Sequence, residues 1–333
     1  MAAPTPARTY RGTARNLEFL ARRLQAGELV AVPTETVYGL AAHALDAAAC
    51  AGIFRAKGRP ADDPLIVHLH SARQLGLVGE ANAAARRLAR AFWPGPLTMV
   101  LPKKPAVPTI VTAGRDSVAV RVPRHPLFRR LLKLAAVPLA APSANPFGYI
   151  SPTTARHVRE GLGEKIRHIL DGGPCAIGVE STIVDLRDPR RPAILRPGAI
   201  TAEQIARVLG RRVRTTQRAA PAEKARGQLA PGLLARHYSP RTPLELHREI
   251  PPGIWRSGPA REAFILQRRP RGTAPRGVVW LDATGRLPGV ARRLFATLRR
   301  LDAQGFARIH AELAPERGLG RAINDRLRRA AAR

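Results

Sequence analysis

Apolar residues along the first 200 positions recur with two spacings, one typical of helices and the other of short buried strands. Residues 13–26 carry three leucines at helical spacing and are followed by Gly27, a common helix terminator. Asp46 can cap a second helix, which Gly58 would end. The pattern predicts helices at residues 13–26, 46–57 and 81–92, and strands at 29–32, 65–69, 97–101, 118–122, 137–140, 166–170, 182–186 and 193–195.

The apolar pattern weakens after residue 210 and then resumes. Residues 211–231 are rich in Arg, Ala, Gln and Pro with little periodicity, which indicates a surface linker. Because several successive strands before it lack a predicted helix between them, the first sheet is expected to be mixed. Beyond the linker the pattern predicts strands at 264–267, 278–281 and 307–311, and helices at 289–303 and 321–331. We expect a first domain over 10–208, a linker over 209–243 and a smaller α/β domain over 244–333.

Composition adds a strong positive charge to this picture. The 333 residues include 56 Lys and Arg against 24 Asp and Glu, a formal net charge of +32. Such a balance favours polyanionic partners such as nucleic acid or nucleotides. The arginines are spread along the whole chain, however, so a general drift of composition toward Arg and Ala explains most of the charge equally well. Charge alone therefore does not decide the function.

Cysteine usage and hydropathy indicate a cytoplasmic protein. Cys50 and Cys175 lie far apart and have neither metal-ligand nor disulfide-framework spacing. Residues 1–11 lack the apolar core of a signal peptide. No apolar run approaches the roughly 20 residues that span a bilayer, so we expect no membrane association.

The first candidate binding segment is residues 33–40, which directly follow a predicted strand. No common phosphate-binding loop is present, so a nucleotide would have to be held in another way. Loops at strand ends are where α/β proteins build their sites. The hydroxyls of Thr34 and Thr36 beside Tyr38 suit a small polar ligand. A capped turn that merely packs its tyrosine is the alternative.

A second candidate is the basic turn at residues 57–64. Lys57 and Arg59 at a helix end can simply complement the helix dipole. Two prolines stiffen this turn, however, and a rigid basic turn could clamp a triphosphate. His68 follows on the next predicted strand, where a lone histidine is more often structural than a ligand contact.

Arg121 is the third candidate, because it interrupts an apolar strand. An unpaired guanidinium would be costly there, so it needs an anion, either an internal carboxylate or the carboxylate of a ligand. Small hydroxyl residues occur in further tight turns at 141–145, 151–153 and 178–183, and another arginine lies at 195–198. Taken singly, each of these segments could be a turn with a satisfied side chain.

Together these segments are far more specific. In chain order the sequence contains PTETVYGL (33–40), KGRPADDPLIVHL (57–69), WPGPLTMVLP (93–102), SVAVRVP (117–123), APSAN (141–145), SPT (151–153), GVESTIVD (178–185) and LRPG (195–198). This set resembles the threonylcarbamoyl-AMP synthase (L-threonylcarbamoyladenylate synthase) family, whose catalytic part is the YrdC-like domain. The resemblance covers residues 10–205 densely and continues through HYSP (237–240) and GLGRAINDRL (318–327), as in the long form with an additional C-terminal domain.

The resemblance implies a YrdC-like α/β fold, an open mixed twisted sheet with helices around a concave basic cleft, plus a Rossmann-like C-terminal domain. It implies that Lys57 and Arg59 lie at the phosphates, and that Tyr238 reaches over the nucleotide from the linker. The threonine pocket implied by the resemblance consists of Thr36, His68, Arg121, Ala141 and Ser181. The implied ATP contacts are Arg59, Asp63, Ser117, Ser143, Ser151, Arg196 and Tyr238. Asp63 departs from the family, which usually has Asn there, so a carboxylate could face phosphate or metal.

The resemblance also implies a nucleotidyltransferase reaction. L-threonine, bicarbonate and ATP would give threonylcarbamoyl-AMP and pyrophosphate, for modification of a tRNA adenosine next to the anticodon. ATP is then a substrate accompanied by Mg²⁺, no protein-held metal is implied, and downstream tRNA-modifying proteins are partners. One alternative is a non-catalytic RNA-binding or ribosome-associated protein that contacts tRNA or double-stranded RNA. Another is a relative that transfers carbamoyl groups to a different substrate.

Overall fold

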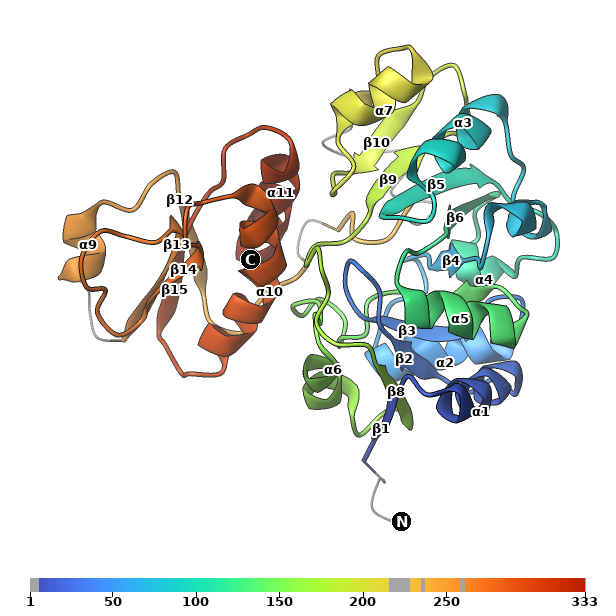
Figure 1. The fold of residues 1–333 in the computed structure, drawn as a ribbon, viewed down its shortest axis with the longest axis horizontal. Helices are drawn as coiled ribbons and strands as arrows, with labels where there is room; N and C mark the ends of the chain where they lie inside the picture. The colour runs from blue at the N-terminus through green and yellow to red at the C-terminus, as the bar shows by residue number, and fades with distance from the viewer. Residues whose placement is uncertain (1–5, 216–227, 235–236, 258–260, 333) are drawn as a thin grey trace.

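The computed structural model describes residues 6–215, 228–234, 237–257 and 261–332. Two separate β-sheets organise this part of the chain, and Figure 1 shows them side by side with helices between them. Among the residues described, none of the helices has the length and apolar character that crossing a lipid bilayer requires.

The first sheet has eleven strands within the described residues, in the order β1-β8-β2-β3-β7-β4-β6-β5-β9-β10-β11. Both parallel and antiparallel neighbours occur, so the expectation of a mixed sheet is confirmed. The strands are β1 (Arg8–Arg11), β2 (Val30–Val32), β3 (Gly39–His43), β4 (Ile66–His68), β5 (Leu97–Pro102), β6 (Ser117–Arg121), β7 (Leu139–Ala140), β8 (His168–Asp171), β9 (Thr182–Asp185), β10 (Ala193–Arg196) and β11 (Arg214–Thr215).

Helices cover both faces of this sheet. They are α1 (Ala14–Gln25), α2 (Ala47–Lys57), the 3-10 helix η1 (Ala72–Leu77), α3 (Ala83–Phe92), α4 (Thr109–Thr112), α5 (Pro126–Ala135), α6 (Ala155–Leu162) and α7 (Ala202–Leu209). The apolar faces of α1 and α5 pack on one side of the sheet. Helices α2, α3, α6 and α7 contribute to the larger core on the other side. Each sheet face is thereby closed, as burial of its apolar side chains requires.

Local signals explain where several of these helices begin and end. The side chains of Thr13 and Asp46 accept backbone N–H groups at the starts of α1 and α2. Thr201 and Gln204 form a reciprocal capping box at the start of α7. Gly58 takes the left-handed conformation with φ 62° that ends α2. The basic turn that follows therefore leaves the helix in a fixed direction.

In the part of the chain that the structure describes, the second sheet has four strands, all parallel, in the order β12-β15-β13-β14. They are β12 (Leu244–His247), β13 (Glu262–Arg268), β14 (Val278–Asp282) and β15 (Arg308–Glu312). Helices α10 (Leu287–Asp302) and α11 (Leu319–Ala331) pack on the face turned toward the first sheet, and the short α9 (Pro252–Arg256) packs on the opposite face (Figure 1).

The two parts are joined by direct packing of α10 and α11 on the first sheet's loops. Val37, Ile150 and Val179 share one apolar cluster with Phe295 and other residues of the second part. Arg299 on α10 donates to the carbonyl of Ile150 at 2.5 Å. These contacts hold the second part beside the loops that build the candidate site.

The predicted elements that appear in the structure agree with it to within a few residues. The reason given for a mixed sheet was partly wrong, because α5 and α6 lie between strands that the apolar pattern left unconnected. Strands β1, β3 and β12 and helices α4, α7 and α9 were also missed. β3 overlaps the end of the motif at residues 33–40, which was expected to be a loop throughout. Of the expected linker, residues 216–227 and 235–236 lie outside the described part.

Candidate functional site

The candidate site is a cavity where the loops after β2, α2 and β7 meet the loops before β9 and after β10. Its empty volume is about 500 Å³, part of which is open to solvent. Segments that lie far apart in the sequence contribute to it. The lining residues are Thr34, Thr36, Val37, Gly39, Arg59, Ile66, His68, Arg121, Ala141, Pro142, Ser143, Glu180, Ser181, Arg196, Pro231, Gly232, His237 and Tyr238.

Arg121 is held at the end of β6 by three groups of the protein. Its Nε donates to the carbonyl of Gly95 at 3.1 Å, and its Nη1 donates to Thr36 Oγ1 at 3.0 Å. Its Nη2 lies 2.7 Å from Glu35 Oε1 in a buried ion pair. The structure thus supplies the internal carboxylate that the sequence left as one of two options. A guanidinium has five N–H donors, so these contacts do not exhaust it.

Glu35 is a site residue that sequence reasoning missed, although it lies within the quoted PTETVYGL motif. Burial acts to raise the pKa of Glu35, but the charge of Arg121 and its hydrogen bond outweigh burial, so the net pKa lies below the usual value. Its second oxygen accepts the backbone N–H of Arg124 at 3.1 Å. The pair therefore stays ionised, which fixes the orientation of Arg121 toward the cavity.

Thr34 and Thr36 shape the wall beside Arg121. Thr34 Oγ1 accepts the backbone N–H groups of Thr36 and Val37, and the two threonine hydroxyls lie 2.8 Å apart. His68 lies on the neighbouring β4, in register with Arg121. Burial, reinforced by the charge of Arg121, lowers the pKa of His68 to about 3. The imidazole is therefore neutral at physiological pH and can orient a ligand without adding charge.

Arg196 and Ser181 form a second polar corner of the cavity. Arg196 Nε donates to the carbonyl of Ser181 at 3.1 Å, and its Nη2 donates to Ser181 Oγ at 3.1 Å. Nη1 donates to the carbonyl of Pro231 at 3.1 Å. These partners are neutral, and no carboxylate of the described residues forms an ion pair with Arg196. This corner suits an anionic ligand group.

Arg59 lies on the cavity wall but is paired with Asp63. The Arg59 Nη2 to Asp63 Oδ2 distance is 2.9 Å, and Arg59 also donates to the carbonyls of Asp63 and Pro64. Burial lowers the pKa of Arg59, while the charge of Asp63 counteracts it. The carboxylate of Asp63 thus faces a guanidinium. That Asp63 also faces phosphate or metal stays a prediction, because its pairing with Arg59 does not test it.

Lys57 lies behind the cavity wall rather than on it. Its Nζ donates to the carbonyls of Ser143 at 2.6 Å and Asn145 at 2.5 Å. Burial, followed by the neighbouring charge of Arg59, lowers the pKa of Lys57 well below its ordinary value. In this structure Lys57 positions the loop that carries Ser143, which does line the cavity.

Ser151 and Ser117 also lie off the cavity wall. Ser151 Oγ donates to Glu180 Oε1 at 2.5 Å, and Ser117 is buried at the start of β6. Glu180, a second missed residue, lines the cavity and binds Arg326 of α11 through its other oxygen at 2.9 Å. Arg326 is fully buried. Glu180 and Arg326 lie in the quoted motifs GVESTIVD and GLGRAINDRL, respectively. Sequence reasoning found these motifs but did not single out either side chain.

Tyr238 reaches the cavity from the segment before the second sheet. Its backbone has φ 64°, uncommon for a residue with a side chain. Its ring stacks on Phe295, and the guanidinium of Arg326 lies 5.6 Å from the ring centroid. Gly232 faces it with φ 76°, and a Cβ there would lie 2.7 Å from the Tyr238 hydroxyl. The chain therefore needs glycine at 232 to bring the two segments together.

The structure gathers nine of the thirteen predicted site residues around one cavity: Thr36, Arg59, His68, Arg121, Ala141, Ser143, Ser181, Arg196 and Tyr238. The other four, Lys57, Asp63, Ser117 and Ser151, are not among the residues that line it. Direct ATP contact by these four stays a prediction.

Comparisons with known proteins cover both parts of the chain. A family model described as telomere recombination matches residues 22–198, and the model of the threonylcarbamoyl-AMP synthase C-terminal domain matches residues 200–332. The threonylcarbamoyl-AMP synthase of Pyrococcus abyssi is 42% identical over 323 residues, covering 92% of this chain and 91% of that protein. The Bacillus subtilis synthase is 41% identical over 332 residues, covering 92% and 90%.

A solved structure extends the agreement to three dimensions. The crystal structure of P. abyssi Sua5 complexed with L-threonine has a TM-score of 0.87 to this chain. It is 39% identical and covers 98% of each chain. Both parts of the sequence and the whole fold are thus accounted for by one kind of protein. The chain belongs to the threonylcarbamoyl-AMP synthase family.

Proposed function

We propose that this chain makes threonylcarbamoyl-AMP and pyrophosphate from L-threonine, bicarbonate and ATP, as a nucleotidyltransferase. The observation that carries the proposal is the convergence of Arg121, Ser181 and Arg196 on one cavity. The carboxylate of an amino acid and the phosphates of a nucleotide need two cationic anchors in one cavity. Family membership supports the same reaction.

L-threonine is proposed to bind at the Arg121 end of the cavity. The free N–H donors of Arg121 can take the threonine carboxylate, while Glu35 keeps the guanidinium in place. The neutral His68 and the hydroxyl of Thr36 can orient the amino acid. Ala141 offers an apolar surface to the methyl group. One methyl is worth only about 1–3 kcal/mol of discrimination, so serine is the expected competitor.

ATP is proposed to bind at the Arg196 end. Arg196 and Arg59 supply positive charge for the phosphates, and Ser143 supplies a hydroxyl, while Ser181 of the predicted threonine pocket would lie where the two ligands meet. Tyr238 and Gly232 close this side of the cavity. The two carboxylates near this end of the cavity already have partners. Glu180 contacts Ser151 and Arg326, and Asp63 pairs with Arg59. Mg²⁺ would therefore be held mainly by the phosphate oxygens of ATP.

The reaction then needs no protein nucleophile. The amine of threonine joins the carbon of bicarbonate with loss of water, which gives a carbamate. A carbamate oxygen attacks the α-phosphorus of ATP, the bond to the β-phosphate oxygen breaks, and pyrophosphate leaves. The chain's contribution is to hold two anions in line and to neutralise charge that moves to the leaving group. We propose that tRNA-modifying proteins take the labile product.

The test is release of pyrophosphate by the purified chain. With ATP, threonine and bicarbonate, release is expected only when threonine is present, together with an adduct of the mass of threonylcarbamoyl-AMP. Arg59→Ala should raise the ATP concentration needed for half-maximal rate with little change in that for threonine. Folded protein that binds RNA but releases no threonine-dependent pyrophosphate would refute the proposal and favour the RNA-binding alternative.

A further inference from the structure

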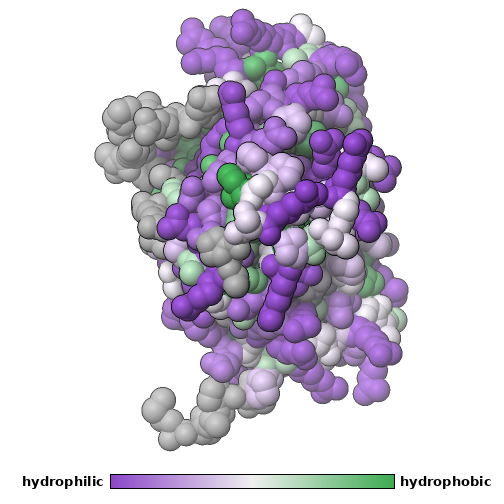
Figure 2. All heavy atoms as spheres, turned by 90° about the vertical axis from the view of Figure 1, so that its left-hand side faces the viewer, coloured by the Kyte–Doolittle hydropathy of each residue, from purple (hydrophilic) through white to green (hydrophobic). Residues whose placement is uncertain are grey.

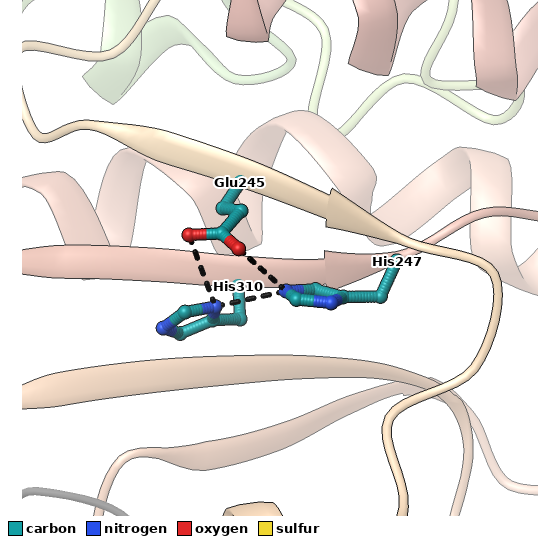
Figure 3. A group of neighbouring side chains, drawn as sticks. All are labelled: Glu245, His247 and His310. Carbon is teal, nitrogen blue, oxygen red and sulfur yellow. Dashed lines mark hydrogen bonds and ion pairs between the residues drawn. The ribbon is translucent and has the colours of Figure 1, made fainter.

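A second group of chemistry-bearing side chains lies on the outer face of the second sheet, away from the cavity. Glu245 and His247 project from β12, and His310 projects from β15 beside them (Figure 3). Helices α10 and α11 cover the opposite face of this sheet, between it and the first sheet (Figure 1). The synthase reaction does not use this group.

The strand register explains why these three side chains meet. In parallel strands β12 and β15, Glu245 pairs with His310 and His247 pairs with Glu312. Side chains alternate between the two faces of a strand, so Glu245, His247 and His310 share one face. Three ligand atoms, one from each residue, lie within 4.8 Å of one another.

Glu262 on β13 determines which nitrogen of His310 faces the group. His310 Nε2 lies 3.1 Å from Glu262 Oε2, and an ionised carboxylate can only accept. The Nε2 atom therefore carries the proton, and a neutral His310 presents the lone pair of Nδ1 to the centre of the group. A carboxylate behind a histidine in this way is the common outer partner of a metal-bound imidazole.

The distances within the group are close to those between the ligands of a tetrahedral ion, and in the metal-free state the two imidazoles share a hydrogen bond. His247 Nε2 and His310 Nδ1 are 2.9 Å apart. Glu245 Oε1 lies 3.7 Å from His247 Nε2, and Glu245 Oε2 lies 4.0 Å from His310 Nδ1. Two ligands of a tetrahedral zinc ion with bonds of about 2.0–2.1 Å are separated by about 3.3 Å. To reach that geometry the two imidazole nitrogens must move apart, with the ion replacing their hydrogen bond, and one carboxylate oxygen must approach both of them.

We propose that Glu245, His247 and His310 bind a divalent transition-metal ion, with Zn²⁺ the preferred one. Two imidazoles and one carboxylate form a ligand set typical of zinc, with water in the fourth position. Ca²⁺ and Mg²⁺ prefer all-oxygen sites and are not expected to compete. Although the chain has a net charge of +32, the face around this group carries the carboxylates of Glu245, Glu262 and Glu312.

Arg308 competes with the ion for the carboxylate of Glu245. Its Nη1 lies 2.7 Å from Glu245 Oε2, and both side chains are about half exposed. Figure 2, which looks at this side of the molecule, shows a surface dominated by hydrophilic side chains. A metal must displace the guanidinium from at least one carboxylate oxygen. Removal of Arg308 should therefore strengthen metal binding.

The ion would stabilise β12, which is an edge strand. Among the described strands, β12 lies at the edge of the second sheet and pairs with β15 alone. Tyr238, which lines the cavity, precedes β12 by six residues, and the segment between them is anchored by Thr242, whose N–H donates to Asp302 Oδ1 at 2.8 Å. An ion that bridges β12 and β15 therefore stabilises the second sheet at the point where the chain leaves the cavity.

The test is titration of the full, tag-free chain with Zn²⁺ by calorimetry, and with Co²⁺ followed by visible absorption. One ion per chain, the intense d–d bands of tetrahedral Co²⁺ and a rise in melting temperature are expected. His247→Asn should abolish all three. Glu262→Gln should weaken binding roughly 10–100-fold, as for other outer partners of a metal-bound histidine. The matched control is His70→Asn on the first part of the chain, which should leave binding unchanged.

Arg308→Gln separates a metal site from a plain cross-strand ion-pair cluster. A metal site predicts tighter Zn²⁺ binding in this variant, because Glu245 is released. The inference is overturned if wild type and His247→Asn bind Zn²⁺ equally, or if Arg308→Gln weakens the binding. Circular dichroism of each variant establishes that it is folded, so loss of binding cannot be attributed to unfolding.

Discussion

The cavity and the outer face of the second sheet hold their charged side chains in opposite ways. In the cavity, Arg121 and Glu35 are almost fully buried, with side-chain exposures of 4% and 7%, and their charges face each other at 2.7 Å. On the outer face, Arg308 and Glu245 are 50% and 46% exposed at the same separation of 2.7 Å. Equal distances thus occur in very different surroundings.

This difference decides what each region can do. A buried ion pair cannot exchange its partner for water, so its geometry is maintained before a ligand arrives. Such a cavity is suited to a reaction that depends on positioning and fixed charge. An exposed pair is worth little and can be replaced by another partner, which is what an adaptable metal site requires. Substitutions in the two regions should therefore differ in effect, with the largest loss in the cavity.

Arg121→Gln should have the largest effect, because it leaves the charge of Glu35 buried without its partner. We expect the free energy of unfolding to fall by about 3–5 kcal/mol and the affinity for L-threonine to fall roughly 100-fold. Urea denaturation and calorimetric titration with threonine measure the two quantities. ATP affinity should change much less.

The double variant Arg121→Gln with Glu35→Gln serves as its control. Removing both charges should restore much of the stability but not the threonine binding. If the double variant bound threonine like the wild type, Arg121 would not be the carboxylate anchor.

Gly178→Ala should have the next largest effect, by separating α10 from the cavity loops. Gly178 has φ 85°, and a Cβ there would lie 2.5 Å from the carbonyl oxygen of Ala291. Backbone strain and overpacking together should lower the free energy of unfolding by about 2–4 kcal/mol and reduce synthase activity. Gly305, with φ 72° and open space around it, is the matched control. Gly305→Ala should cost about 1–2 kcal/mol through backbone strain alone and leave activity intact; equal loss of activity would remove the role given to the α10 contact.

His68 should make the cavity sensitive to acid. Its pKa is lowered from 6.5 to about 3 by burial and by Arg121. Below pH 6.5 His68 is therefore protonated in the unfolded state but stays neutral in the folded state. The free energy of unfolding consequently decreases as the pH falls from 6.5 toward 3. At pH 5 this difference in the pKa of His68 should lower the free energy of unfolding by about 2 kcal/mol. The drop in unfolding free energy from pH 7 to pH 5 should be smaller by this amount in His68→Gln, and an unchanged drop would show that His68 titrates normally.

Arg308→Gln should have the smallest effect on stability. The pair with Glu245 is half exposed, so its loss should cost no more than about 1 kcal/mol. Urea denaturation in the presence of a chelator measures this without interference from metal. A loss as large as that of Arg121→Gln would contradict the contrast between the two regions.

Much of the fold could be predicted from the apolar pattern, but not all of it. Elements with a clear period and a cap, such as α2 between Asp46 and Gly58, were placed to within one residue. Helix α5 was missed although its apolar residues Phe128, Leu131 and Leu132 have helical spacing, because it follows a proline-rich turn directly. β3 was missed because its first two residues, Gly39 and Leu40, belong to a motif that was treated only as a loop.

The candidate site shows where sequence reasoning ends. That Arg121 needed an anion followed from its apolar strand, but that Glu35 provides it depends on the turn that brings the two together. Asp63 illustrates the same limit, since its partner Arg59 became evident only in three dimensions. The contact of Arg326 with Glu180 joins residues 146 positions apart, and no local pattern could reveal it.

The central claim is that one cavity seats threonine beside the innermost phosphorus of ATP. A crystal structure with L-threonine and a non-hydrolysable ATP analogue tests it most directly. We expect the threonine carboxylate at Arg121 and the α-phosphate between Ser181 and Arg196, both within the same cavity. Threonine and nucleotide bound at separate places, or either one bound away from these arginines, would contradict the account.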